Sequence, residues 1–249
     1  MQHQHSGAAS RELSRHQAQT AWPFQQAWPG CHFSSLYFDH GKLQRQLLPE
    51  LDQLPGNSKR QAEFVAGRIC ARHALRQFLP DATAPAYQPD SRVPVWPRAT
   101  CGSISHSHGH AVAVAASQQH WLALGLDIER MIAPQRAARL CGSLLTTSEQ
   151  DIHQRSGWPL PDFLTCAFSA KESLFKLLNP LTGSYFGFQD AELVQLATDG
   201  SLRLQLRKQL GVQWPAASII AGQWARFGQG FVTITGVAAE PTTAAPELP

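Results

Sequence analysis

Long hydrophobic runs are missing from this sequence. No apolar stretch reaches the roughly 18 residues that a membrane-spanning helix needs, and no hydrophobic region follows the first basic residues of the N-terminus. These absences argue against an integral membrane protein and against a secretory signal. We therefore expect a protein that works in the cytoplasm, away from membranes.

Cysteines are few and scattered. The sequence has five of them, an odd number, and no two form a C-x-x-C pair. A disulfide framework and a structural zinc site both need paired or closely spaced cysteines. The pattern argues against both and fits reduced thiols in a cytoplasm.

Charged residues are also scarce, at 16% of the chain against 43% hydrophobic residues. This balance is typical of a globular protein and excludes a disordered chain. The net charge of +3 is too small to predict nucleic-acid binding, although it suits an acidic partner or a phosphate-rich ligand.

Apolar periodicity and turn residues place helices and strands along the chain. A strand is expected at 31–38, and a long helix from Ser58 to about Leu79, stopped by Pro80. Further helices are expected at 131–142, from Thr147, and at 161–178 before Asn179-Pro180, and strands at 192–197, 202–207, 217–225 and 231–238.

This order predicts an α/β (α+β) fold made of two similar α/β halves. We place the halves at residues 23–130 and 131–239, between a flexible N-terminal segment, 1–22, and a flexible tail, 240–249. Both end segments have too little apolar content to join a core.

Two apolar runs, 111–116 and 121–128, indicate a hairpin, because four polar or bulky residues separate them. Such a hairpin would bring Ser105 and His106 close to Asp127 and Glu129.

Asp127 and Glu129 close a buried strand, where alternate residues share a face. Two carboxylates about 7 Å apart at the edge of an apolar core repel each other unless a cation lies between them. All the ligands are oxygens, so a hard cation such as Mg²⁺ suits them best. For this motif alone, a strand end with two hydrated acids is the preferred interpretation.

Glu172 and Lys176 are four residues apart on a predicted helix, a spacing that favours a surface ion pair. Phe168 and Phe175 flank them and indicate a partly buried site instead. On the helix at 58–79, Arg68, Arg72 and Arg76 recur every four residues behind Lys59 and Arg60. That row is either a solvated face or a phosphate site.

Ser105 and His106 invite comparison with a serine hydrolase, but the G-x-S-x-G nucleophile motif is missing. His106, His108 and His110 stand at alternate positions without a second cluster to complete a transition-metal site. A polar loop with one functional histidine is the preferred interpretation.

Three segments carry a resemblance to a known family. They are Gly102-Ser103-Ile104-Ser105-His106, Gly125-Leu126-Asp127-Ile128-Glu129 and Phe168-Ser169-Ala170-Lys171-Glu172-Ser173-Leu174-Phe175-Lys176. In order and spacing they resemble the signature motifs of 4'-phosphopantetheinyl transferases of the Sfp type. The segment from Lys59 to Arg72 resembles the branch that contains the enterobactin synthetase component EntD.

The resemblance implies two similar halves in a pseudo-two-fold arrangement, with the active site in the cleft between them. It implies a Mg²⁺-dependent holo-[acyl-carrier-protein] synthase. Such an enzyme transfers the 4'-phosphopantetheine arm of coenzyme A to a serine of an acyl or peptidyl carrier protein and releases adenosine 3',5'-bisphosphate. The carriers serve fatty acid, polyketide or siderophore biosynthesis. A fold of this size closes its own site, so we expect a monomer.

Residue by residue, the resemblance implies Mg²⁺ ligands at Asp127, Glu129 and Glu172. Glu172 is the expected general base and Lys176 the second catalytic residue, with Lys171 and Lys176 at the pyrophosphate. Coenzyme A contacts are expected from Ser105 and His106, and from Arg60, Arg68 and Arg92. In Ser91-Arg92-Val93-Pro94 the spacing from the basic residue to the proline is one residue longer than in the family pattern.

Two other functions stay open. One is a different Mg²⁺-dependent phosphoryl or nucleotidyl transferase, and the other is a non-catalytic module that binds coenzyme A or a carrier protein. Asp127, Glu172 and Lys176 favour an enzyme, since a pure binder has little use for a metal site.

Overall fold

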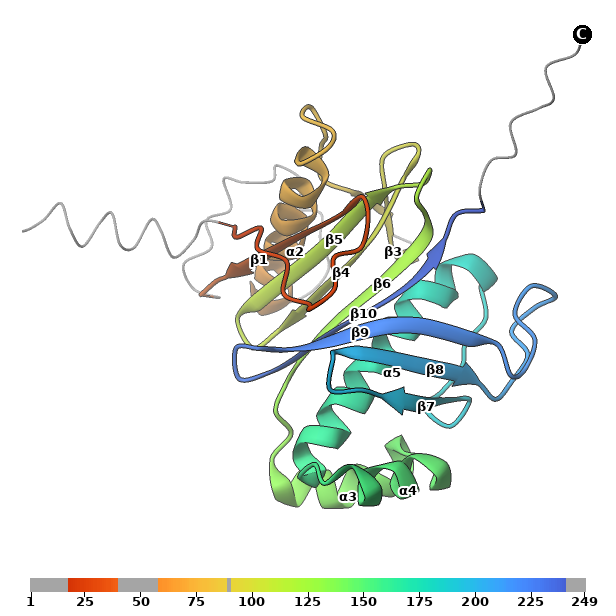
Figure 1. Ribbon diagram of the computed structural model, residues 1–249. Coiled ribbons are helices and arrows are strands. Elements are labelled where there is room, and N and C mark those ends of the chain that lie inside the picture. Colours follow the sequence, from red (N-terminus) through yellow and green to blue (C-terminus); the bar gives the residue numbers. More distant parts are fainter. Residues whose placement is uncertain (1–17, 40–57, 89–90, 241–249) are drawn as a thin grey trace, which may run out of the picture.

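The residues described by the computed structural model are 18–39, 58–88 and 91–240, without the side chains of Ser58, Ser91 and Arg92. Their strands form two main sheets, one of three strands and one of five (Figure 1). The fold is mixed α/β, as the order of elements predicts. No helix in the described ranges is both long and apolar enough to cross a membrane.

The small sheet has a helix on one face only. Its antiparallel strands lie in the order β1 (Cys31–Tyr37), β5 (His110–Ser117) and β4 (Thr100–Ser107). Along β5, Ala111 and Ala113 pack against helix α2 (Ser58–Arg76), whereas Val112 and Val114 point the other way. The second face of this sheet is therefore apolar and needs a cover.

The large sheet supplies that cover. Its antiparallel strands lie in the order β6 (Trp121–Arg130), β10 (Gly230–Ala238), β9 (Ile219–Phe227), β8 (Ser201–Leu206) and β7 (Ala191–Leu196). Leu126, Ile128 and Val232 join Val112 and Val114 in one buried cluster. A single core thus fixes the two sheets against each other.

Helix α5 (Leu160–Thr182) crosses the other face of the large sheet, with α3 (Pro134–Leu144) and α4 (Thr147–Ser156) beyond it (Figure 1). Its apolar stripe, which recurs at spacings of three and four residues, is fully buried, at Phe163, Ala167, Ala170, Leu174 and Leu177. At the crossing, a Cβ atom on Gly125 would lie 1.9 Å from the carbonyl oxygen of Ser173. Only glycine lets α5 approach β6 so closely, and this approach brings the helix next to Asp127.

The two sheets meet where β4 runs beside β6 (Figure 1). The Cys101 thiol donates a hydrogen bond to the Trp121 carbonyl oxygen over 3.2 Å, and Ser105 Oγ donates to Asp127 Oδ1 over 2.9 Å. The residue numbers rise together, so the strands run in the same direction. We call this line of contacts, from Cys101–Ser107 on β4 and Trp121–Glu129 on β6, the seam.

The predicted hairpin between residues 111–116 and 121–128 is wrong. Both edges of β5 are already paired, with β1 on one side and β4 on the other, so β6 pairs with β10 instead. The actual hairpin joins β4 to β5 through His108 and Gly109, both with positive φ. Ser105 still lies beside Asp127, because the seam rather than a hairpin brings them together.

The predicted helices and strands are present, with shifted ends. Helix α2 ends at Arg76, three residues before Leu79. Helix α5 continues through Pro180, which lies in its last turn, and ends before Gly183, whose N–H donates to the Asn179 carbonyl oxygen. A short separate pair, β2 (Ala86–Gln88) and β3 (Ser91–Val95), lies in the proline-rich connection.

Candidate active site

Three predicted site residues meet at the centre of the seam, each from a different element. Lys176 Nζ, on α5, donates to Asp127 Oδ1 and to Ser105 Oγ, over 2.7 Å in each case. Ser105 Oγ in turn donates to Asp127 Oδ1. The side chain of Asp127 is 4% exposed and that of Lys176 28%. The ion pair is therefore shielded on the acid side and open to solvent on the lysine side.

The second oxygen of Asp127 has no such partner. Asp127 Oδ2 is buried, and no hydrogen bond reaches it within the described part of the chain. A buried carboxylate oxygen without a donor or cation is costly, because it has lost its water and gained nothing in return. This atom is the point where the site is incomplete.

Glu129 and Glu172 add negative charge around Asp127. Burial first, and the Asp127 charge second, raise the pKa of Glu129 to about 8, and the same two causes raise the pKa of Glu172. Lys176 opposes both shifts. Across the described ranges, however, no three His, Cys, Asp or Glu side chains are grouped closely enough to hold a metal ion. The acids influence one another without forming a closed ligand cage.

Comparison with known proteins adds independent information. The family model for the 4'-phosphopantetheinyl transferase N-terminal domain matches residues 56–116, and that for the 4'-phosphopantetheinyl transferase superfamily matches residues 123–228. The chain belongs to the 4'-phosphopantetheinyl transferase superfamily. It is a phosphopantetheinyl transferase, as the resemblance of its motifs predicts, and its carrier proteins are implied by the family.

Individual relatives agree with this assignment. Enterobactin synthase component D of Salmonella typhi is 40% identical over 173 residues, which cover 69% of this chain and 70% of the relative. The protein of the same name from Escherichia coli strain K12 is 38% identical over 148 residues, 59% of this chain and 68% of that one. The 4'-phosphopantetheinyl transferase Svp of Streptomyces mobaraensis is 32% identical over 206 residues, 76% of each chain.

In this transferase the two matched regions meet at the seam. The first ends within β5 and the second begins within β6. Ser105 therefore comes from the first region, and Asp127, Glu129, Glu172 and Lys176 come from the second.

Lys171, which was expected with Lys176 at the pyrophosphate, does not lie with Lys176 in the seam. Its ammonium group is buried and donates to Glu149 Oε2, to the Leu144 carbonyl oxygen and to the Phe188 carbonyl oxygen, over 2.6 to 2.8 Å. These three bonds use all its protons. Lys171 and Lys176 are five residues apart, which turns their side chains by about 140° around the helix. That spacing already argued against both lysines facing one site.

Glu149 is the partner that sequence reasoning missed. It is fully buried, and besides Lys171 it accepts hydrogen bonds from the backbone N–H groups of Thr146 and Leu193. Thr146 and Glu149 form a capping box at the start of α4. The T-x-x-E spacing was the signal for the cap, but nothing in the sequence showed that a lysine of α5 completes it.

Of the residues predicted to contact coenzyme A, His106 lies on the opposite face of β4 from Ser105. His106 faces α2, where its Nδ1 lies 3.7 Å from Glu63 Oε2. Since neighbouring residues of a strand point to opposite faces, His106 does not join Ser105 in the seam. Arg60 is exposed in the first turn of α2, and the Arg92 side chain lies outside the described residues.

Arg68 is an unusual cation. It is 7% exposed, its guanidinium lies 4.3 Å from the centre of the Phe64 ring, and its Nε is buried without a hydrogen-bond partner in the described part of the chain. Its Nη2 donates a long hydrogen bond, 3.5 Å, to the Ala86 carbonyl oxygen. Burial lowers the pKa of Arg68 to about 10. Among the described residues, no acid pairs with this charge.

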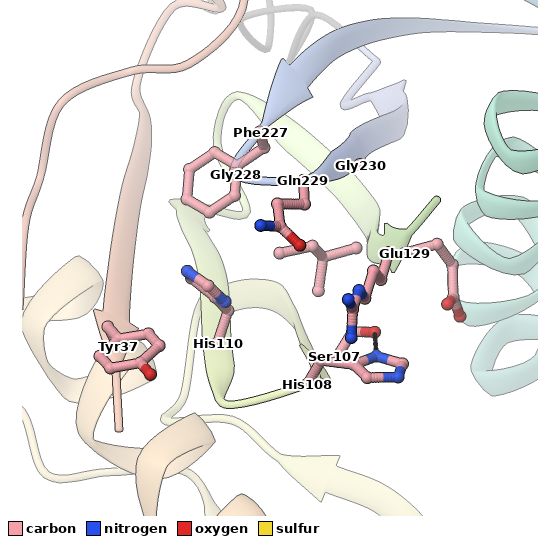
Figure 2. Close-up of a pocket in the computed structure, with 11 residues that line it drawn as sticks. Tyr37, Ser107, His108, His110, Glu129, Phe227, Gly228, Gln229 and Gly230 are labelled. Atoms are coloured by element: carbon pink, nitrogen blue, oxygen red, sulfur yellow. Dashed lines mark hydrogen bonds between the residues drawn. The ribbon is translucent and has the colours of Figure 1, made fainter. Parts of the chain in front are cut away.

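A pocket opens at the end of the seam, next to Glu129 (Figure 2). It has a volume of about 260 Å³ and lies between the β4–β5 turn, the end of β6 and the β9–β10 turn. Of its lining, sequence reasoning had named only Glu129 as a site residue and His108 and His110 as metal candidates. Tyr37 is distant in the sequence from Phe227 and Gln229, and no motif links them.

Proposed function

We propose that this enzyme transfers the phosphopantetheine arm of coenzyme A to a serine of an acyl or peptidyl carrier protein, with Mg²⁺ held beside Asp127. Adenosine 3',5'-bisphosphate is the second product. The observation that carries the proposal is the buried, unpartnered Oδ2 of Asp127, next to a lysine and two further acids with raised pKa values.

The donor set suits a divalent cation of the hard class. Asp127, Glu129 and Glu172 offer carboxylate oxygens, the ligands that Mg²⁺ prefers, and a cation would relieve the repulsion that raises the pKa values of the two glutamates. When bound, Mg²⁺ supplies charge neutralisation for the pyrophosphate and for its leaving oxygen.

The chain's own residues have defined tasks in this transfer. Lys176 presents its ammonium from the solvent-open side of the seam and neutralises a pyrophosphate oxygen. Ser105 holds both Lys176 and Asp127 in place through its hydroxyl. Glu172, whose raised pKa makes it a stronger base than an exposed glutamate, accepts the proton of the carrier serine hydroxyl.

The nucleotide end of coenzyme A belongs on the α2 side. Arg68 is a buried cation without an acid partner among the described residues, and a phosphate would supply the missing charge and hydrogen bonds. His106, on the α2-facing side of β4, and Arg60, on α2 itself, belong to this region as well. We propose Arg92 as a fourth contact. Tyr87, which packs edge-on against Phe64 over 5.5 Å, offers an aromatic surface beside them.

At the level of the fold, we propose two functional halves, 23–130 and 131–239, in a pseudo-two-fold arrangement with the active site between them. The seam supports this placement, since its residues come from β4 in one matched region and from β6 and α5 in the other. Strand β6 pairs with the C-terminal strands, so the first half lends this strand to the larger sheet. All site residues belong to one chain, which suits a monomer.

The relative from Salmonella typhi is a component of enterobactin synthase, and enterobactin is a siderophore. We therefore propose a carrier domain of siderophore assembly as the first substrate to test, with fatty-acid carriers as the comparison.

Intact-mass measurement tests the proposal directly. The full chain is incubated with coenzyme A, Mg²⁺ and an apo carrier protein, and the carrier is expected to gain one phosphopantetheine. Asp127→Ala should abolish the gain, whereas Asp151→Ala, an exposed acid on α4, should leave it unchanged. Binding of coenzyme A without any transfer would favour the non-catalytic module instead.

A further inference from the structure

The pocket at the end of the seam has an aromatic wall that the proposed chemistry does not use. The ring of His110 lies edge-on between those of Tyr37 and Phe227, with centroid distances of 5.0 and 6.1 Å. Figure 2 shows these three rings along one side of the pocket, Gln229 reaching into its middle, and Glu129 on the other side. Tyr37 is 56% exposed, so part of its ring is accessible to a ligand in the pocket.

The pocket lies at the next pair of seam residues, two positions beyond Ser105 on β4 and two beyond Asp127 on β6. Ser105 contacts Asp127, and two residues further along, Ser107 and Glu129 both line the pocket. Ser105 and Ser107 share one face of β4 because they are alternate residues, while His106 between them faces α2. The pocket and the proposed nucleotide side therefore lie on opposite faces of β4, and Ser105, on the pocket's face, bonds Asp127.

Phosphoryl transfer has a directional requirement that distinguishes these two faces. The attacking oxygen and the leaving oxygen lie roughly in line through the phosphorus. Here the leaving oxygen belongs to adenosine 3',5'-bisphosphate, on the α2 side. The carrier serine must then enter from the opposite side, where the pocket lies. The pantetheinyl oxygen occupies neither of these two positions, because it stays on the phosphorus.

We infer that this pocket receives an apolar side chain of the carrier protein, one that lies beside the acceptor serine in the carrier sequence. The inference rests on the proposed function and adds to it the place where the acceptor docks. Aromatic rings around a volume of about 260 Å³ suit one aliphatic side chain. The Gln229 amide is placed to bond the carrier backbone next to it.

Two variants of the pocket test the inference. Tyr37→Ala removes an exposed ring, and Gln229→Trp fills the pocket from the exposed β9–β10 turn. Each should raise the KM for the apo carrier about tenfold, since burial of one aliphatic side chain is worth that much affinity. The KM for coenzyme A should stay within about twofold of that of the wild type. Val212→Ala, at a side chain 94% exposed in the β8–β9 connection, is the matched control.

The carrier provides the second half of the test. The apolar residues on either side of its serine are changed to alanine one at a time. With one of these carriers, Tyr37→Ala should cause no further loss, because the two partners of a single contact are then both absent. Fully additive losses with every carrier variant would overturn the inference.

The remaining outcomes separate this inference from the proposed function. A raised KM for coenzyme A with an unchanged KM for the carrier would assign the pocket to the pantetheine arm, and unchanged values for both would show that the pocket is not used. If the wild-type chain transfers nothing, the proposed function fails. Titration of fluorescently labelled apo carrier onto the wild type and Tyr37→Ala then decides the docking site without turnover, since equal affinities would refute it.

Discussion

Helix α5 holds two lysines, each bonded to a carboxylate, and the two pairs differ in how completely they are satisfied. Lys171 and Glu149 are both buried, and every proton of the ammonium has an acceptor. Lys176 and Asp127 leave one buried carboxylate oxygen without a partner among the residues that the structure describes, and one side of the lysine is open to solvent. The Lys171–Glu149 pair has no group left to bond a ligand. In the Lys176–Asp127 pair, the exposed side of the lysine and the second carboxylate oxygen can still bond one. The completeness of hydrogen bonding, rather than the presence of an ion pair, separates a structural contact from a functional one.

The largest effect is expected at the satisfied pair. Lys171→Ala leaves the buried Glu149 charge unpaired and should lower the free energy of unfolding by about 3–5 kcal/mol, measured by urea denaturation. The exposed Lys208→Ala is the control. The double variant Lys171→Met with Glu149→Leu should recover most of the loss. A loss below about 1 kcal/mol in the single variant would show that the pair does not stabilise the fold.

Lys176→Ala should behave in the opposite way. Its removal leaves the buried Asp127 carboxylate with the Ser105 hydroxyl but without its ion-pair partner. Because the lysine is partly exposed, the free energy of unfolding should fall by only about 1–2 kcal/mol, less than in Lys171→Ala. The loss of charge stabilisation at the pyrophosphate should reduce kcat by about 10²–10³, measured by the rate of carrier modification. An inactive but strongly destabilised variant would erase the difference between the two lysines.

The next effect concerns pH and the unsatisfied acids. The pKa of Glu129 is about 8 in the folded chain, well above that of an exposed glutamate. Between roughly pH 4.5 and 8 the folded state therefore binds a proton that the unfolded state has lost, and stability falls as pH rises. We expect a decline on the order of 2 kcal/mol over this range in Mg²⁺-free buffer.

Two comparisons check this explanation. Glu129→Gln should flatten the decline, and saturating Mg²⁺ should suppress it in the wild type, because both remove the repulsion between the acids. Thermal unfolding at several pH values measures the decline in stability. A wild-type stability that rises between pH 5 and 8 would contradict the assignment.

The smallest effect is expected at the cap that completes the satisfied region. Thr146→Ala removes the side-chain acceptor for the Glu149 N–H and should cost about 1 kcal/mol of stability. Thr146→Ser should retain most of it, and carrier modification should stay at the wild-type rate in both variants. A selective loss of activity would mean that α4 contributes to the site as well as to the fold.

The local elements were predictable because their signals are local. The alternation of apolar residues and the Asp199-Gly200 turn predict β7 and β8, and the apolar stripe predicts the buried face of α5. Helix ends were predicted less well. Pro180 predicted an end at about Leu178, but α5 continues past this proline and ends before Gly183, which has the left-handed conformation typical of a helix C-terminus.

The sequence by itself determined the family and the candidate acids and bases. The order and spacing of the motifs around Ser105, Asp127 and Glu172 are properties of the chain, and the comparisons agree with them. Only the tertiary structure decided which residues act together. The pairing of β5 with two neighbours rules out the expected hairpin, the packing of α5 turns Lys171 inward, and the meeting of two sheets creates the pocket beside Glu129. Each of these depends on contacts between residues far apart in the chain, and local periodicity carries no information about such contacts.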